Sequence, residues 1–158
     1  MTLANIVLEK LSEAKPATGR HELAFTDEAS GDGSTSWSMY LVADRTDEMS
    51  VLAWEISLRR PENKGDVVAW AKRVAESSGA LEPLKVVEID SPRRQALIRS
   101  ASPSKRKDKL FYYEVILEGT GSARVCRFRA SNDGARREQM AFALTHEALG
   151  RLIEELTD

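Results

Sequence analysis

Residues 110–131 read LFYYEVILEGTGSARVCRFRAS, and they decide the fold because two strand-like runs flank a glycine-rich turn. Alternation of side chains between two faces is typical of strands, and a short turn containing glycine joins antiparallel neighbours. If Thr120-Gly121 is a two-residue turn, one face of the hairpin enters the core. That face would carry Phe111, Tyr113, Val115, Leu117, Arg124, Cys126, Phe128 and Ala130.

The same turn fixes the pairs on the opposite face of the predicted hairpin. Glu114 would lie opposite Arg127, and Tyr112 opposite Arg129. An exposed cross-strand ion pair or cation–π contact contributes at most about 1 kcal/mol. One interpretation is therefore that this face does no more than keep the sheet soluble.

Outside the hairpin, some segments have apolar residues at helical spacing and others have them at every second position, as strands do. Helical spacing predicts helices over about 3–14 and 64–78, and a third helix that begins after Thr145 as its cap. The predicted strands cover 21–29, 37–43, 52–58, 84–90, 95–101, 110–118, 123–131 and, less regularly, 137–144. The fold class is then α+β in the order α-βββ-α-ββββ(β)-α. We expect a largely antiparallel sheet with three helices packed on one face, all within a single domain over 1–158.

Charge is distributed unevenly along the chain. From Ser91 to Arg137 there are twelve Lys and Arg against four acids, a local balance of +8, whereas the 158 residues together carry −2. The stretch predicts a basic, strand-rich region on an acidic body. The candidate partner-binding residues are Arg93, Arg94, Arg99, Lys105, Arg106, Lys107, Lys109, Tyr112, Arg127 and Arg129.

Two classes of partner fit this basic 91–137 segment. An acidic protein would be attracted to the cations by electrostatic steering. Single-stranded nucleic acid would use the cations for its phosphates and Tyr112 for base stacking. An overall pI of about 5.8 argues against the wide positive field that nucleic-acid binders need.

No spacing in the sequence nominates catalytic residues, a metal site or a cofactor. His21 and His146 are the two histidines, and the lone Cys126 falls on the predicted core face, where a thiol is inert. Three indoles, Trp37, Trp54 and Trp70, leave open a small-ligand pocket between sheet and helix, against the simpler reading that they pack the core. The sequence therefore favours a non-enzymatic protein.

Localisation is predicted from the cysteine and the hydropathy. One cysteine forms no intrachain disulfide, so folding requires no oxidising compartment. No apolar run approaches the length that crosses a bilayer, and residues 1–10 lack the basic start of a signal peptide. We expect a cytoplasmic protein that does not contact the membrane.

The order of elements resembles the type III secretion chaperone-like fold. A first helix from Leu3 to Ala14 precedes a three-stranded meander that ends at Leu58, a helix that carries Val67 to Val74 comes next, and strands and a closing helix from Leu149 to Leu156 follow. The resemblance rests on this order, on length and on acidity. It implies a small cytosolic homodimer that holds a protein partner without catalysis, and so a chaperone- or adaptor-like domain.

Overall fold

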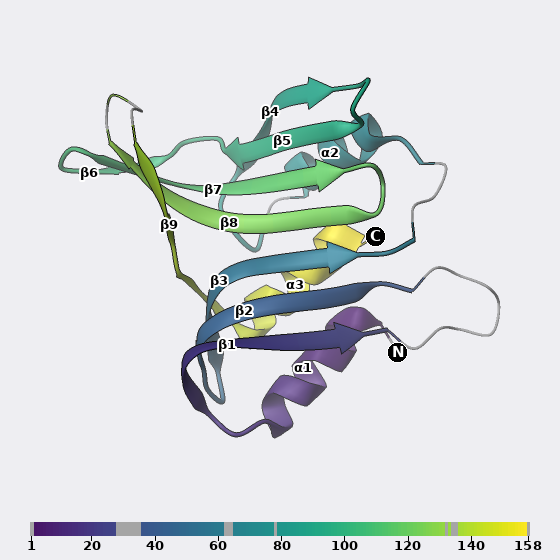
Figure 1. The fold of residues 1–158 in the computed structure, drawn as a ribbon, viewed down its shortest axis with the longest axis vertical. Coiled ribbons are helices and arrows are strands. Elements are labelled where there is room, and N and C mark those ends of the chain that lie inside the picture. The colour runs from purple at the N-terminus through teal and green to yellow at the C-terminus, as the bar shows by residue number, and fades with distance from the viewer. Residues whose placement is uncertain are drawn as a thin grey trace.

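The computed structural model describes residues 2–27, 36–61, 65–77, 79–131, 133 and 136–157 (Figure 1). Within these ranges the elements follow the chain as α1 (Leu3–Glu13), β1 (Ala17–Thr26), β2 (Ser38–Thr46), β3 (Ser50–Arg59), α2 (Val67–Glu76), β4 (Leu84–Asp90), β5 (Gln95–Ser100), β6 (Ser104–Arg106), β7 (Lys109–Glu118), β8 (Ser122–Ser131), β9 (Arg137–Met140), β10 (Phe142–Thr145) and α3 (His146–Thr157). The chain is an α+β fold with a large antiparallel sheet, as the sequence predicts.

The strands form one sheet in the order β1-β2-β3-β8-β7-β5-β4, and every pairing between the described strands is antiparallel. β3 pairs with β8 only from Ile56 to Arg59. Where the two strands separate, β10 pairs with the start of β3 and β9 with the end of β8. Residues 137–145 therefore fill the fork between the halves of the sheet.

The core cluster contains buried residues of the sheet and of all three helices. Each helix begins at a polar side chain that accepts an otherwise unpaired amide: Thr2 for α1, Asp66 for α2 and Thr145 for α3. The indole of Trp70 donates to the carbonyl of Leu156 at 3.1 Å, which links α2 to α3. No helix in the described ranges is long and apolar enough to span a bilayer.

The register of the β7–β8 hairpin differs from the prediction by one residue. Glu118 pairs with Ser122, so the turn has three residues, and Gly119 adopts a φ of 57° that favours glycine. Glu114 consequently faces Cys126 and Tyr112 faces Phe128, and the predicted partners Arg127 and Arg129 face Tyr113 and Phe111 instead.

A one-residue slip moves side chains to the other face of a strand. Val125 and Ala123 of β8 therefore enter the core with Val115 and Leu117, in place of Cys126 and the predicted Arg124.

The second half contains more and shorter strands than predicted. The polar loop at 100–109 includes β6, which pairs back onto β7, and Lys107 has a φ of 53° in the turn. The uncertain strand at 137–144 is split at Ala141 into β9 and β10, because its two parts pair with different strands. β1 begins four residues before the predicted start, and residues 28–29 of that predicted strand and residues 64 and 78 of the predicted second helix lie outside the described residues. The other elements agree with the predicted ranges to within three residues.

The three indoles do not surround one space. Trp37 and Trp70 are buried, with ring centroids 6.0 Å apart, and they join the residue that precedes β2 to α2. Trp54 is half-buried in an irregular part of β3, where it donates to Asp44 and stacks under Arg20. The geometry brings Trp37 and Trp70 together as core residues and leaves Trp54 apart.

Candidate functional site

The face of the sheet that points away from the core cluster is hollowed across β5, β7 and β9. One hollow of about 310 Å³ lies over β4, β5 and β7, and a second of about 190 Å³ lies over β3, β7 and β8. The two share Glu114, Ile116 and Arg137 in their walls. We call these two adjoining hollows together the trough. It is lined by Glu55, Glu88, Asp90, Arg93, Gln95, Ala96, Leu97, Arg99, Glu114, Ile116, Arg124, Cys126, Phe128, Arg137 and Gln139.

Glu114 lies at the floor of the trough and is only 3% exposed. Its Oε2 accepts a hydrogen bond from Nε of Arg99 at 2.9 Å and another from Nη1 of Arg137 at 2.8 Å. A buried carboxylate needs such partners because its desolvation costs several kcal/mol. Two guanidinium groups on one carboxylate leave a local excess of one positive charge, and both guanidinium groups reach solvent.

Aromatic rings fix the directions of the two arginines. Tyr112 and Phe128 are cross-strand neighbours with centroids 5.9 Å apart. Arg99 lies over Tyr112 at 5.4 Å and Arg137 over Phe128 at 3.9 Å. Hydrogen bonds to Tyr112 and Glu114 raise the pKa of Arg137 above its ordinary value, so its charge is permanent. The arrangement holds two cations at defined positions on the sheet.

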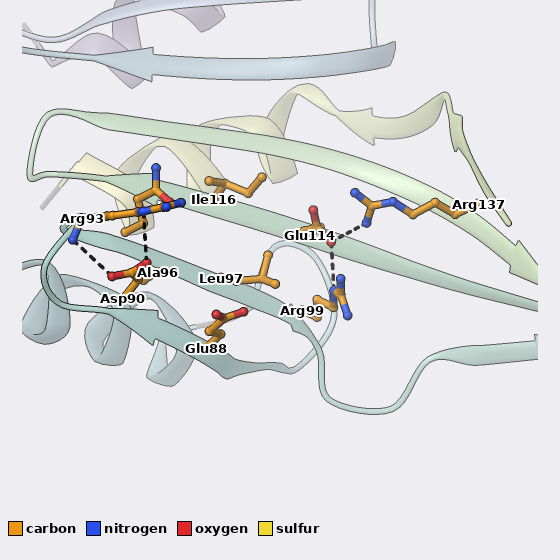
Figure 2. Close-up of a pocket in the computed structure, with 10 residues that line it drawn as sticks. Glu88, Asp90, Arg93, Ala96, Leu97, Arg99, Glu114, Ile116 and Arg137 are labelled. Carbon is orange, nitrogen blue, oxygen red and sulfur yellow. Dashed lines mark hydrogen bonds and ion pairs between the residues drawn. The ribbon is translucent and has the colours of Figure 1, made fainter. Parts of the chain in front are cut away.

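The opposite end of the larger hollow is acidic. Figure 2 shows Arg99 and Arg137 meeting at Glu114 on one side and Arg93 beside Asp90 on the other, with the labelled Leu97 and Ile116 between them. Arg93 reaches Asp90 at 3.7 Å with its side chain 78% exposed. Glu88, which pairs with Leu97 across β4 and β5, adds a second carboxylate on the β4 side of the hollow, between Asp90 and Arg99 in Figure 2.

The smaller hollow contains Cys126. Its Sγ lies 3.6 Å from Oε1 of Glu55 and 3.6 Å from Nε2 of Gln139. Burial, and then the negative charge of Glu55, raise the pKa of the thiol to about 12. Cys126 is therefore a protonated thiol at neutral pH, which makes it a poor nucleophile.

Not all predicted site residues lie together. Arg93 and Arg99 line the trough, and Tyr112 borders it through its contact with Arg99. Lys105 and Arg106 are on β6, and Lys107 and Lys109 continue that hairpin, which projects from the sheet (Figure 1). The predicted basic residues are thus spread over separate surfaces.

The remaining three predicted residues lie elsewhere. Arg127 lies between Phe111 and Tyr113, at 6.0 Å and 4.9 Å from their ring centroids. Arg129 forms an ion pair with Glu138 of β9. Arg94, in the turn after β4, donates to the carbonyl of Gly65 at 3.3 Å.

Of the charged residues that line the trough, the predicted set contains Arg93 and Arg99 and lacks Glu55, Glu88, Asp90, Glu114, Arg124 and Arg137. Glu114 and Arg124 were assigned other surroundings by the incorrect hairpin register, and Arg137 reaches the trough on a strand whose pairing the sequence leaves open. One signal for Glu114 was available, namely a carboxylate within the apolar run of β7, where a buried charge requires a partner.

Chemically, the trough presents fixed charges of both signs beside half-buried apolar side chains. Among the described residues no three His, Cys, Asp or Glu side chains are grouped so that they could hold a metal ion. No protein-family model, no curated protein and no solved structure matches this chain.

Proposed function

We propose that this protein is a non-enzymatic binding domain that holds a segment of a partner protein in the trough, on the face of the sheet opposite to the three helices. The observation that carries the proposal is the arrangement of Arg99 and Arg137 on the buried Glu114. Charged groups fixed in a concave surface give orientation and specificity to a ligand. The chaperone-like order of elements supports the same class of function.

The balance of charge in the trough favours a protein segment over a polyanion. Glu55, Glu88, Asp90 and Glu114 face Arg93, Arg99, Arg124 and Arg137 in its walls. A uniformly negative ligand would meet the carboxylates unfavourably, whereas a peptide carries both signs and apolar groups. Ile116 and Leu97 offer an apolar floor for such a ligand.

Binding can be tested with an array of synthetic peptides that includes internal segments and free carboxyl ends. We expect Ile116→Arg to weaken binding of the best peptides by at least about tenfold, since the new side chain fills the trough. Val68→Arg is the matched control, because Val68 is 38% exposed on α2, away from the trough. Binding that is equal in both variants, or no selective binding at all, would contradict the proposal.

Single-stranded nucleic acid is a second candidate, favoured by one specific observation. Tyr112 and Phe128 form an aromatic pair beside the basic hairpin that includes Lys105, Arg106 and Lys107. Bases could stack on the rings while the hairpin contacts phosphates. Fluorescence anisotropy with a labelled oligonucleotide tests this, and we expect affinity to fall steeply with added salt. Undetectable binding at low ionic strength would remove the candidate.

We also propose that the protein acts in the cytoplasm as a homodimer. The lone Cys126, a thiol among non-cysteine neighbours, supports a reducing compartment, and the chaperone-like order of elements supports a dimer. Fractionation of cells that express the tagged full chain measures the compartment.

A further inference from the structure

We propose that the larger hollow of the trough binds a zwitterion: a lysine or arginine with a free α-carboxylate. The carboxylate would lie at Arg99 and Arg137, and the cationic side chain at Glu88. Two sources supply this chemistry, the carboxyl end of a peptide and the free amino acid. The inference rests on the proposed function, since a peptide end would be part of the segment held in the trough.

The anion end of the hollow has unused donors. Each guanidinium has five N–H donors, and Arg99 and Arg137 each give one group to Oε2 of Glu114. In the described part of the chain, the other hydrogen bond of these two guanidinium groups is a long one, from Nη1 of Arg137 to Tyr112 at 3.5 Å. The side chain of Arg99 is 37% exposed and that of Arg137 is 42% exposed. A guanidinium with free donors suits a carboxylate, which accepts two parallel hydrogen bonds.

Electrostatics at this end favour an anion. Glu114 neutralises only one of the two guanidinium charges. Lys85 pairs with Arg99 across β4 and β5, which places a further cation beside the same position. The local excess of positive charge is thus matched to a single carboxylate.

The cation end has the opposite imbalance. Asp90 is contacted by Arg93, whereas none of the described cations forms an ion pair with Glu88. Two carboxylates and one guanidinium leave an excess of one negative charge. A ligand ammonium or guanidinium beside Glu88 would balance it.

The distance between the two ends fits a basic side chain. Glu88 of β4 pairs with Leu97, and Arg99 is two residues farther along β5, so strand rise and strand spacing together separate the backbones of Glu88 and Arg99 by about 8 Å. A lysine or arginine side chain extends about as far from its own α-carboxylate. Leu97 and Ile116, both half-buried, line the hollow beside Glu88 and Glu114 and would contact the methylene groups.

Calorimetric titration of the full chain with N-acetyl-Gly-Gly-Lys tests the chemistry. We expect binding that weakens at least about tenfold when the carboxyl end is amidated, and by a similar factor when lysine is replaced by norleucine. Free L-lysine distinguishes the sources: affinity equal to that of the peptide identifies the amino acid as the ligand, and weaker affinity identifies the peptide end. Equal binding of acid and amide, or no binding at millimolar concentration, would overturn the proposal.

Variants locate the ligand in the hollow. Glu88→Gln changes an exposed side chain and should weaken binding of the lysine peptide about tenfold while leaving the norleucine peptide unaffected. Arg137→Gln should weaken the binding of both peptides that have a free carboxyl end, the lysine peptide and the norleucine peptide. Arg129→Gln, which lies outside the trough, should weaken the binding of neither. Circular dichroism confirms that each variant is folded. If Glu88→Gln has no effect, the assignment of the cation end is wrong.

The two proposals fail differently. Should Ile116→Arg abolish binding of array peptides while the acid and amide of the lysine peptide bind equally, the trough binds protein segments without recognising a zwitterion. If L-lysine binds and no array peptide does, the hollow is a small-molecule site and the proposed partner protein is wrong.

Discussion

Glu114 shows how a single residue organises this surface. A carboxylate in the middle of an apolar strand is unfavourable unless it is paired, and Arg99 and Arg137 come from two other strands to pair with it. The three side chains therefore join β5, β7 and β9 by one buried group.

We expect Glu114→Gln to lower the free energy of unfolding by about 1–3 kcal/mol, because the amide keeps the shape but leaves two guanidinium groups without their carboxylate. Urea denaturation measures the change. Glu138→Gln is the matched control, since it removes an exposed partner of Arg129, and such surface pairs contribute about 0–1 kcal/mol. An equal loss in the two variants would show that Glu114 has no special role.

Cys126 gives a prediction about pH. Because its pKa is raised to about 12 in the folded protein, the folded state retains the proton more strongly than the unfolded chain. This contribution to stability is complete below the ordinary thiol pKa and is lost as pH rises from about 9 toward 12. We expect urea midpoints between pH 8 and 10.5 to fall more steeply for the native chain than for Cys126→Ala. If the urea midpoints of the native chain and of Cys126→Ala change in parallel with pH, the pKa of Cys126 is not raised in the folded protein.

At the scale of elements, the β7–β8 hairpin shows what the sequence can and cannot predict. Alternation identifies both strands and the buried Val115 and Leu117. The segment Gly119-Thr120-Gly121 is compatible with a turn of two or of three residues, and only packing against β3 and β5 selects between them. The strands were therefore predictable and their register was not.

The turn itself can be tested through Gly119. Its φ of 57° is disfavoured for residues with a Cβ, and its amide donates to the carbonyl of Arg94 at 2.6 Å. We expect Gly119→Ala to lower the free energy of unfolding by about 1 kcal/mol or more. Gly121→Ala is the control, since Gly121 has no positive φ. A smaller loss at Gly119 than at Gly121 would refute this account of the turn.

The trough was harder to predict than the fold for the same reason. Arg99, Glu114 and Arg137 are far apart in sequence, and their meeting depends on three separate strand pairings. The basic 91–137 segment did contain both arginines, so composition identified the region. Composition could not show that Arg99 and Arg137 meet at one carboxylate, because local patterns do not encode long-range register.

For the whole molecule, oligomeric state is the property with the clearest test. β4 ends the sheet order, and it exposes Val87 and Ile89 by 44% and 37%. An exposed apolar edge strand is a common place for a second chain to pair. We expect the homodimer implied by the resemblance to use this edge.

Sedimentation velocity should then show a dimer for the native chain and a monomer for Val87→Lys, because a charge on the edge opposes pairing. Glu22→Lys on β1, the other end of the sheet order, is the control and should remain dimeric. A native chain that sediments as a monomer at all concentrations would exclude the dimer.

The position of β9 and β10 in the fork between β3 and β8 also has a consequence for biosynthesis. A ribosome delivers the chain from its N-terminus, so β1 to β8 emerge before the strand that brings Arg137 to Glu114. A nascent chain at that stage has the floor of the trough without one of its two guanidinium groups. The convergence of Arg99 and Arg137 on Glu114 would therefore be completed only after β1 to β8 have emerged.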